Sequence, residues 1–166
     1  MKILFSIFTI LLCSYSYSQE NVEFFQKNKE KIEIKAVNNF EKLEITFSKN
    51  KKKQLIDSIE TSLTDKKTYF SIEDYNFDGY KDFAVYRTDD GMGVYTIYQV
   101  FIYNPDKILF TKLKMPLSSG AACDEFCDIK VDKKSKTFQS SCRGGAKWHT
   151  DTWKFDKNKK LVFLKK

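Results

Sequence analysis

The sequence has few prolines, one histidine and a single long apolar run. Its two prolines, Pro105 and Pro116, both stand outside the runs that alternate apolar and polar residues. Proline cannot donate a hydrogen bond within a sheet, so this placement leaves the alternating runs free to form strands. The one histidine, His149, lacks the paired spacing with cysteines that a zinc finger needs. It also has no evident serine or cysteine partner, so we expect neither a zinc site nor a hydrolytic triad.

The long apolar run stands at the N-terminus. A positive charge precedes the run Ile3–Cys13, and a stretch of small residues and tyrosines follows it up to Ser18. This order is typical of a secretory signal peptide, and the run is shorter than the roughly 20 apolar residues of a membrane span. We therefore expect removal of residues 1–18 and a periplasmic or secreted mature chain, 19–166, without a transmembrane anchor. A lipoprotein signal ending at Cys13 is the alternative.

The chain is basic, with a formal net charge of +7. Its lysines gather where turns are expected, within 49–53, 133–136 and 157–160. Lysines at turns and edges keep strands of different molecules from pairing. Attraction to anionic surfaces or glycans is the alternative interpretation. No nucleic-acid binding motif accompanies the charge, so we expect no nucleic-acid partner.

Strand patterns dominate the mature chain. KIEIKAV (31–37) alternates apolar and charged residues, and VYTIYQVFIY (94–103) is rich in β-branched and aromatic residues. Such runs, bounded by turn residues, predict antiparallel strands. The segment 52–63 places its apolar residues on one helical face but also suits a strand, and 21–31 is a second short helical candidate. We expect one all-β domain over 19–166, whose antiparallel hairpins form a propeller-blade-like sheet or a sandwich.

Three cysteines remain after the expected cleavage: Cys123, Cys127 and Cys142. Export permits a disulfide, and the odd number leaves one thiol free. The sequence predicts a hairpin with its turn near 132–136, and symmetric pairing about that turn brings Cys127 opposite Cys142. Only a close cross-strand pair satisfies disulfide geometry. We therefore predict a Cys127–Cys142 disulfide, with Cys123–Cys142 as the alternative.

The stretch DYNFDGYKD (74–82) concentrates carboxylate and amide oxygens in one turn. Its spacing matches the first nine positions of an EF-hand calcium loop, with Gly79 at the sharp turn. Val85 stands where the bidentate glutamate would be, so we expect weak, structural binding, on the order of 10⁻⁴ to 10⁻³ M. An Asx-rich turn without an ion is the alternative. The predicted ligands are Asp74, Asn76, Asp78, the Tyr80 carbonyl oxygen and Asp82.

This loop, D-x-N-x-D-G-x-x-D between two strands, resembles the calcium loops of FG-GAP repeats in β-propellers and of their single-blade relatives. Together with DDGMG (89–93), a long aromatic strand and CRGG (142–145) before KWHTDTWKF, it resembles a family of bacterial periplasmic proteins. That family includes an immunity protein against a lysozyme-like effector of a type IV killing system, and it is related in shape to periplasmic lysozyme inhibitors. The resemblance covers 55–164. It implies an inhibitor or immunity protein that binds and blocks a peptidoglycan-cleaving glycosidase.

The resemblance also implies a binding loop. Those inhibitors insert a small protruding loop, often with a Ser-Gly pair and a tyrosine, into the glycosidase cleft. Here PLSSGAAC offers Ser118, Ser119 and Gly120 but no tyrosine, and we expect Tyr95 and the DDGMG turn as neighbours. No catalytic motif stands out, so we expect a binding protein and not an enzyme. The alternative function is a calcium-stabilised glycan- or surface-binding module.

Overall fold

The computed structural model describes residues 21–117 and 119–164. The expected signal peptide, 1–18, and Ser118 of the expected binding loop lie outside the described residues. Within these ranges the chain forms thirteen strands in antiparallel sheets and no helix, which confirms the predicted all-β class. Accordingly, none of the described segments is an apolar helix long enough to cross a bilayer.

The strands form three sheets that follow one another along the chain, each a meander in which sequence neighbours pair. The first sheet contains β1 (Asn21–Phe25), β2 (Lys31–Val37), β3 (Lys42–Phe47) and β4 (Lys53–Asp57). The middle sheet contains β5 (Thr68–Glu73), β6 (Asp82–Thr88), β7 (Thr96–Asn104) and β8 (Leu109–Lys112), with the short β9 (Phe126–Cys127) added to β7. The third contains β10 (Lys130–Asp132), β11 (Thr137–Gly144), β12 (Lys147–Phe155) and β13 (Leu161–Leu164).

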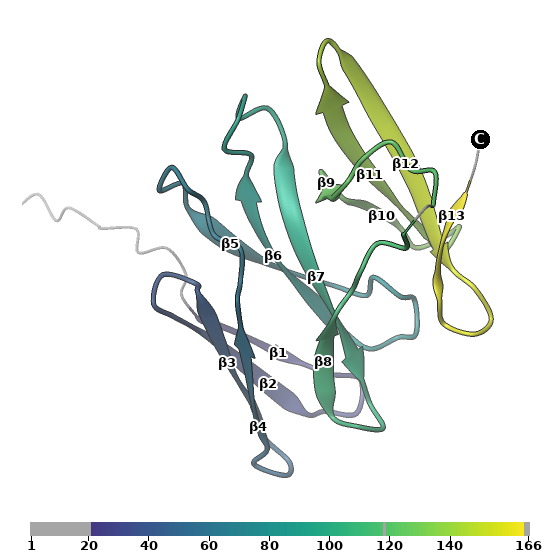
Figure 1. The fold of residues 1–166 in the computed structure, drawn as a ribbon. Helices are drawn as coiled ribbons and strands as arrows, with labels where there is room; N and C mark the ends of the chain where they lie inside the picture. Colours follow the sequence, from purple (N-terminus) through teal and green to yellow (C-terminus); the bar gives the residue numbers. More distant parts are fainter. Residues whose placement is uncertain (1–20, 118, 165–166) are drawn as a thin grey trace, which may run out of the picture.

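The middle sheet lies between the other two, as Figure 1 shows. Successive residues of a strand point to opposite faces. In β6, Phe83 and Val85 join a core against the first sheet, whereas Ala84 joins a core against the third. Because both faces of β6 are covered, its central residues 83–86 are continuously apolar instead of alternating. The first sheet has one solvated face, so β2 buries Ile32, Ile34 and Ala36 and exposes Glu33 and Lys35, which alternate with them.

Both segments with helical patterns form strands. Residues 21–25 are β1, which pairs with β2, and β4 occupies Lys53–Asp57 of the segment 52–63. Residues 53–57 form a strand and not a helix because they pair along the free edge of β3 and so complete the first sheet. The side chain of Gln54 adds a link to the middle sheet: its amide exchanges hydrogen bonds with the backbone N–H (2.8 Å) and carbonyl (2.7 Å) of Phe110.

Candidate functional site

The loop 74–82, between β5 and β6, closes through hydrogen bonds from its own backbone to its polar side chains. The Asp74 carboxylate accepts from the N–H groups of Asp78 (3.1 Å) and Gly79 (2.8 Å). Asn76 Oδ1 accepts from Asp78 N at 3.1 Å, and the Asn76 amide donates to Asp78 Oδ2 at 3.2 Å. Gly79 has a φ of 83°, a conformation that favours glycine. The turn predicted at Gly79 is therefore present.

Asp82 has a different role from the other carboxylates of this loop. Its side chain is fully buried. Oδ2 accepts from the N–H groups of Tyr75 (2.9 Å) and Asn76 (3.3 Å), and Oδ1 accepts from Tyr103 N at 2.8 Å. Burial raises the pKa of Asp82 well above its ordinary value, although the backbone donors of Tyr103 and Tyr75 oppose that shift. Asp82 thus ties the loop to β7 inside the protein.

This arrangement limits how a cation could be held. Among the described residues, no group of three or more His, Cys, Asp or Glu side chains is placed to hold a metal ion. Asp82 differs from Asp74 and Asp78 in being fully buried and bonded to β7, so we treat it as an internal anchor and take the half-buried residues as the candidate ligands. Asp74, Asn76 and Asp78 keep carboxylate and amide oxygens on the turn, which are the hard donors that calcium prefers. With the Tyr80 carbonyl they are fewer than the six to eight ligands calcium takes, so water would have to complete the shell.

The turn between β1 and β2 holds the same loop from outside. The buried Gln26 amide donates to Lys81 O (2.8 Å) and accepts from Lys81 N (2.7 Å). The Lys27 ammonium donates to Asp78 O at 2.9 Å and lies 3.8 Å from the centre of the Tyr80 ring. A cation in that position gains from the negative face of the ring. Sequence reasoning missed both residues, because no motif links this turn to a loop some fifty residues away.

The predicted Cys127–Cys142 disulfide is wrong; Cys142 pairs with Cys123, which confirms the alternative pairing. The predicted hairpin exists, with Lys130 of β10 opposite Gln139 of β11. It ends there, because Asp128 has a φ of 41° and the chain turns away from β11. Residues 126–127 become β9, in which Cys127 lies opposite Ile97 of β7 instead of Cys142.

Cys127 remains a buried free thiol. Its backbone N–H donates to Ser140 Oγ at 2.8 Å. Burial, followed by the negative charges of Glu125, Asp128 and Asp89, raises the pKa of this thiol to about 12. A thiol in this state is a poor nucleophile at neutral pH, so Cys127 serves as a small core residue.

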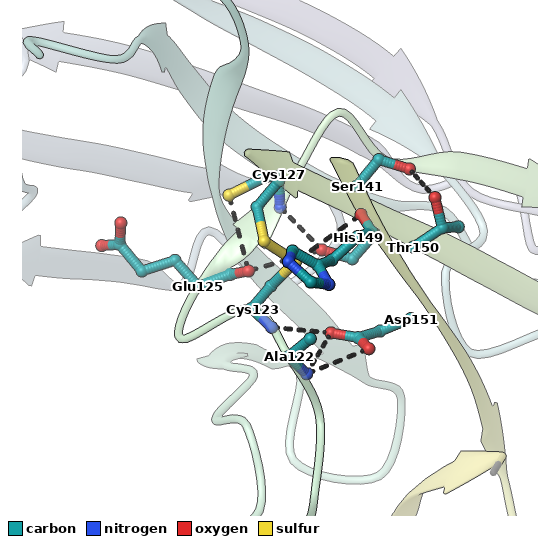
Figure 2. The surroundings of a disulfide bond; sticks show 10 residues. Ala122, Cys123, Glu125, Cys127, Ser141, His149, Thr150 and Asp151 are labelled. Carbon is teal, nitrogen blue, oxygen red and sulfur yellow. Dashed lines mark hydrogen bonds between the residues drawn. A yellow bond between two sulfur atoms is a disulfide. The ribbon is translucent and has the colours of Figure 1, made fainter. Parts of the chain in front are cut away.

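The segment 113–125, which we call the rim loop, joins β8 to β9 and carries the expected binding residues Ser119 and Gly120. The buried Asp151 carboxylate of β12 accepts from the N–H groups of Ala122 (3.0 Å) and Cys123 (2.9 Å), and Figure 2 shows this clasp beside the disulfide.

Within the rim loop, Ser119 Oγ accepts from Ala121 N at 3.2 Å, and Gly120 has a φ of 79°. Leu117 is 96% exposed. The rim loop is therefore fastened at its C-terminal end and presents an apolar side chain to solvent. Asp151 was missed because nothing in its strand pattern distinguishes it from a solvated residue.

Tyr95, the fourth expected binding residue, lies elsewhere. It precedes β7 and packs edge-to-face against Trp148 of β12, with ring centroids 6.4 Å apart. Among the described residues, no hydrogen bond joins it to Ser119 or Gly120. The contacts of Tyr95 therefore associate it with Trp148 and not with Ser119 or Gly120.

No protein family, curated protein or solved structure that was compared matches this chain.

Proposed function

We propose that the chain is an exported inhibitor or immunity protein that binds and blocks a peptidoglycan-cleaving, lysozyme-like glycosidase. The observation that carries this proposal is the construction of the rim loop. One covalent bond and a buried carboxylate fix the segment at Ala122–Cys123, and Leu117 stands free a few residues before it. The resemblance in the sequence supplies the class of target.

A fixed loop suits inhibition because binding has to overcome the entropy of ordering the groups that make contact. A loop already held in its bound shape loses less entropy than a free one and so binds more tightly. The Cys123–Cys142 bond and the Asp151 clasp remove much of that freedom before any partner arrives. The hydrogen bond from Ala121 N to Ser119 Oγ continues the restraint toward the tip.

Leu117 is the side chain that would enter the partner. Binding energy concentrates in a few apolar or aromatic anchors that fill pockets, and the remaining contacts mainly exclude water. A substrate cleft of a glycosidase is such a pocket, and an occupied cleft cannot admit glycan. Ser119 and Gly120 would lie against the rim of that cleft.

The proposal includes a structural calcium ion in the loop 74–82, held by Asp74, Asn76, Asp78 and the Tyr80 carbonyl. The ion would neutralise carboxylates that otherwise repel one another in one turn. The loop contributes side chains to both cores, since Tyr75 is buried against the third sheet and Tyr80 packs against the core of the first. Calcium in this role stabilises the scaffold and does not contact the target.

The test is inhibition of cell-wall lysis by the purified mature chain against a panel of muramidases, including any encoded beside it. The matched variants are Leu117→Asp and Leu63→Asp, since Leu63 is a comparably exposed leucine (91%) outside the rim loop. Loss of an apolar anchor costs roughly 2 kcal/mol, so Leu117→Asp should raise the inhibition constant about thirtyfold. Leu63→Asp should leave it unchanged. Gly120 is a poorer test position, because its positive φ would strain any side chain.

Two outcomes would overturn the proposal. One is that no muramidase of the panel is bound or slowed at micromolar concentrations of the chain. The other is inhibition that Leu117→Asp and Leu63→Asp weaken equally, since this would place the contact outside the rim loop.

A further inference from the structure

A second feature lies on the other face of the β11–β12 pair. An open groove of about 500 Å³ lies beside this pair and is also lined by Tyr98 of β7. Small-molecule sites typically have volumes of about 300 to 1,000 Å³ and combine aromatic side chains with a few polar groups. The groove has this composition: its lining includes Tyr98, Asp128, Lys130, Ser141, Trp148 and Thr150.

The strand register separates the groove from the disulfide. Ser141 lies opposite Thr150, while the next pair along the strands is Cys142 and His149. Since neighbouring residues in a strand point to opposite faces, Ser141 and Thr150 share the face away from the disulfide. Figure 2 shows the Ser141–Thr150 pair apart from the two bonded sulfur atoms. The groove is therefore distinct from the rim loop, although both depend on β11 and β12.

The aromatic side chains of the groove are held in place while remaining accessible. Trp148 is 52% exposed, and the edge-to-face contact with Tyr95 at 6.4 Å fixes the orientation of its ring. Across the groove, Tyr98 stacks on Tyr86 with ring centroids 4.9 Å apart and an interplanar angle of 15°. The exposed Trp148 indole presents a flat apolar surface and an N–H donor beside these polar groups.

The polar groups of the groove can both donate and accept. The hydroxyls of Ser141 and Thr150 bond to each other at 2.9 Å. Asp128 Oδ1 accepts from Thr96 N (2.8 Å) and Thr96 Oγ1 (2.7 Å), which leaves Oδ2 without a partner among the described residues. The exposed Lys130 ammonium forms no ion pair in the described part of the chain. One carboxylate and one ammonium leave the groove without net charge.

We infer that this groove binds a pyranose saccharide. The chemistry is complementary: one face of a pyranose carries C–H groups that can cover the Trp148 indole, and its edges carry hydroxyls. Those hydroxyls can donate to Asp128 Oδ2 and accept from the Lys130 ammonium and the Ser141–Thr150 hydroxyls. A groove without net charge favours a neutral sugar over a phosphate or a charged peptide. This inference is independent of the proposed inhibition, since it uses another face and other residues.

The chain offers its own reporter for this binding. It has two tryptophans, and Trp153 is fully buried, so a saccharide-induced change in emission reports on Trp148. We expect a saturable blue shift of the emission when a tetramer of β-1,4-linked N-acetylglucosamine or of β-1,4-linked glucose is titrated to 10 mM, a range that detects dissociation constants of about 1 mM.

Variants decide whether the shift comes from this groove. Because Trp148→Ala removes the fluorophore, its binding is measured by calorimetry or NMR. Trp148→Ala should weaken binding at least tenfold, and Thr150→Val, which keeps the shape and removes one hydroxyl, should weaken it less. Leu117→Asp should leave saccharide binding unchanged, which separates this site from the rim loop. The inference is overturned if neither tetramer binds the intact chain, or if Trp148→Ala binds with the affinity of the wild type.

Discussion

The two interfaces of the middle sheet are built differently. Toward the first sheet, fourteen described apolar residues form a buried core that runs from Phe24 to Phe110. Toward the third sheet, the buried core has seven, among them Phe126, Phe138 and Trp153. The second interface adds other fasteners: the Cys123–Cys142 bond, the buried Asp151 carboxylate and the crossing strand β9. The second interface thus has half as many buried apolar residues as the first, and it adds covalent and polar links.

The difference between the two interfaces matches the positions of the segments that we propose bind partners. Apolar burial stabilises in proportion to area and does not fix the shape of an exposed loop. A disulfide and a buried carboxylate with two N–H donors fix particular atoms. The rim loop and the Trp148 groove both border β11 and β12, the strands that these fasteners hold. The first interface provides stability, and the second holds exposed segments in defined positions.

The loop 74–82 joins the two interfaces through Asp82, so removing this side chain gives the largest expected effect. Asp82→Ala leaves the N–H groups of Tyr75, Asn76 and Tyr103 without their acceptor. An unsatisfied buried donor costs about 1 to 3 kcal/mol, so we expect a loss of at least roughly 3 kcal/mol in the free energy of unfolding. Urea unfolding with and without calcium measures it, and the loss should be present in both.

Asp78→Ala is the contrasting variant for the same loop. Calcium at 5 mM should stabilise the wild type by about 1 to 2 kcal/mol if the Kd is on the order of 10⁻⁴ to 10⁻³ M. Asp78→Ala should abolish that gain and cost less than Asp82→Ala when a chelator is present. If the wild type unfolds identically with calcium and with chelator, there is no calcium site. If Asp82→Ala only removes the calcium response, Asp82 is a ligand and not an anchor.

Removing the disulfide should weaken only the second interface. The bond joins residues separated by 19 positions, for which loop-closure entropy predicts a stabilisation of about 3 kcal/mol. We expect Cys123→Ala/Cys142→Ala to lose about that amount in urea unfolding, with faster hydrogen exchange in β11 and the rim loop but not in β2 or β3. Cys127→Ala is the matched control, and a non-reduced peptide map should still show the Cys123–Cys142 link. A Cys127–Cys142 link in the wild type would contradict the structure.

The smallest expected effect is the loss, at acidic pH, of the stability that Asp90 contributes. Asp90 links the β4–β5 connection to the β6–β7 loop by accepting from the Ser62 hydroxyl, Leu63 N (3.1 Å) and Arg87 (2.9 Å). The Ser62 hydrogen bond, foremost among these contacts, holds the pKa of Asp90 well below its ordinary value. A lowered folded-state pKa adds stability that is complete above the unfolded value of about 3.9 and is lost as pH falls toward the folded value.

The difference in unfolding free energy between the wild type and Asp90→Asn isolates this contribution. It should be larger at pH 7 than at pH 2.5, because acid removes the advantage of the carboxylate. A difference that stays constant or grows on acidification would show that Asp90 is not held in its ionised form by these contacts.

Local features of this fold could be predicted from the sequence, whereas long-range pairings could not. The alternation in β2 and the turn at Gly79 follow from residue types within a few positions. The Cys127–Cys142 prediction failed because Asp128 adopts a positive φ and the chain then pairs with β7. A glycine at this position would have indicated such a turn, whereas an aspartate does not. The partner of β9 then depends on a strand some thirty residues earlier.

The candidate site shows the same division. Asp74, Asn76 and Asp78 could be placed on one turn from their spacing, but the inward direction of Asp82 depends on Tyr103, which is 21 positions away. The sequence predicts only that Asp151 is a polar strand residue. Its hydrogen bond to the rim loop depends on the approach of that loop to β12. The three successive meanders share no evident sequence repeat, so their number also emerged only from the structure.

In the proposed function, the disulfide makes the rim loop a rigid binding element. The most direct measurement is the affinity of Cys123→Ala/Cys142→Ala for a muramidase that the wild type inhibits, at a temperature where the variant is folded. We expect the dissociation constant to rise at least tenfold while saccharide binding at the Trp148 groove persists. An unchanged dissociation constant for the folded, disulfide-free variant would contradict the claim that a fixed rim loop performs the binding.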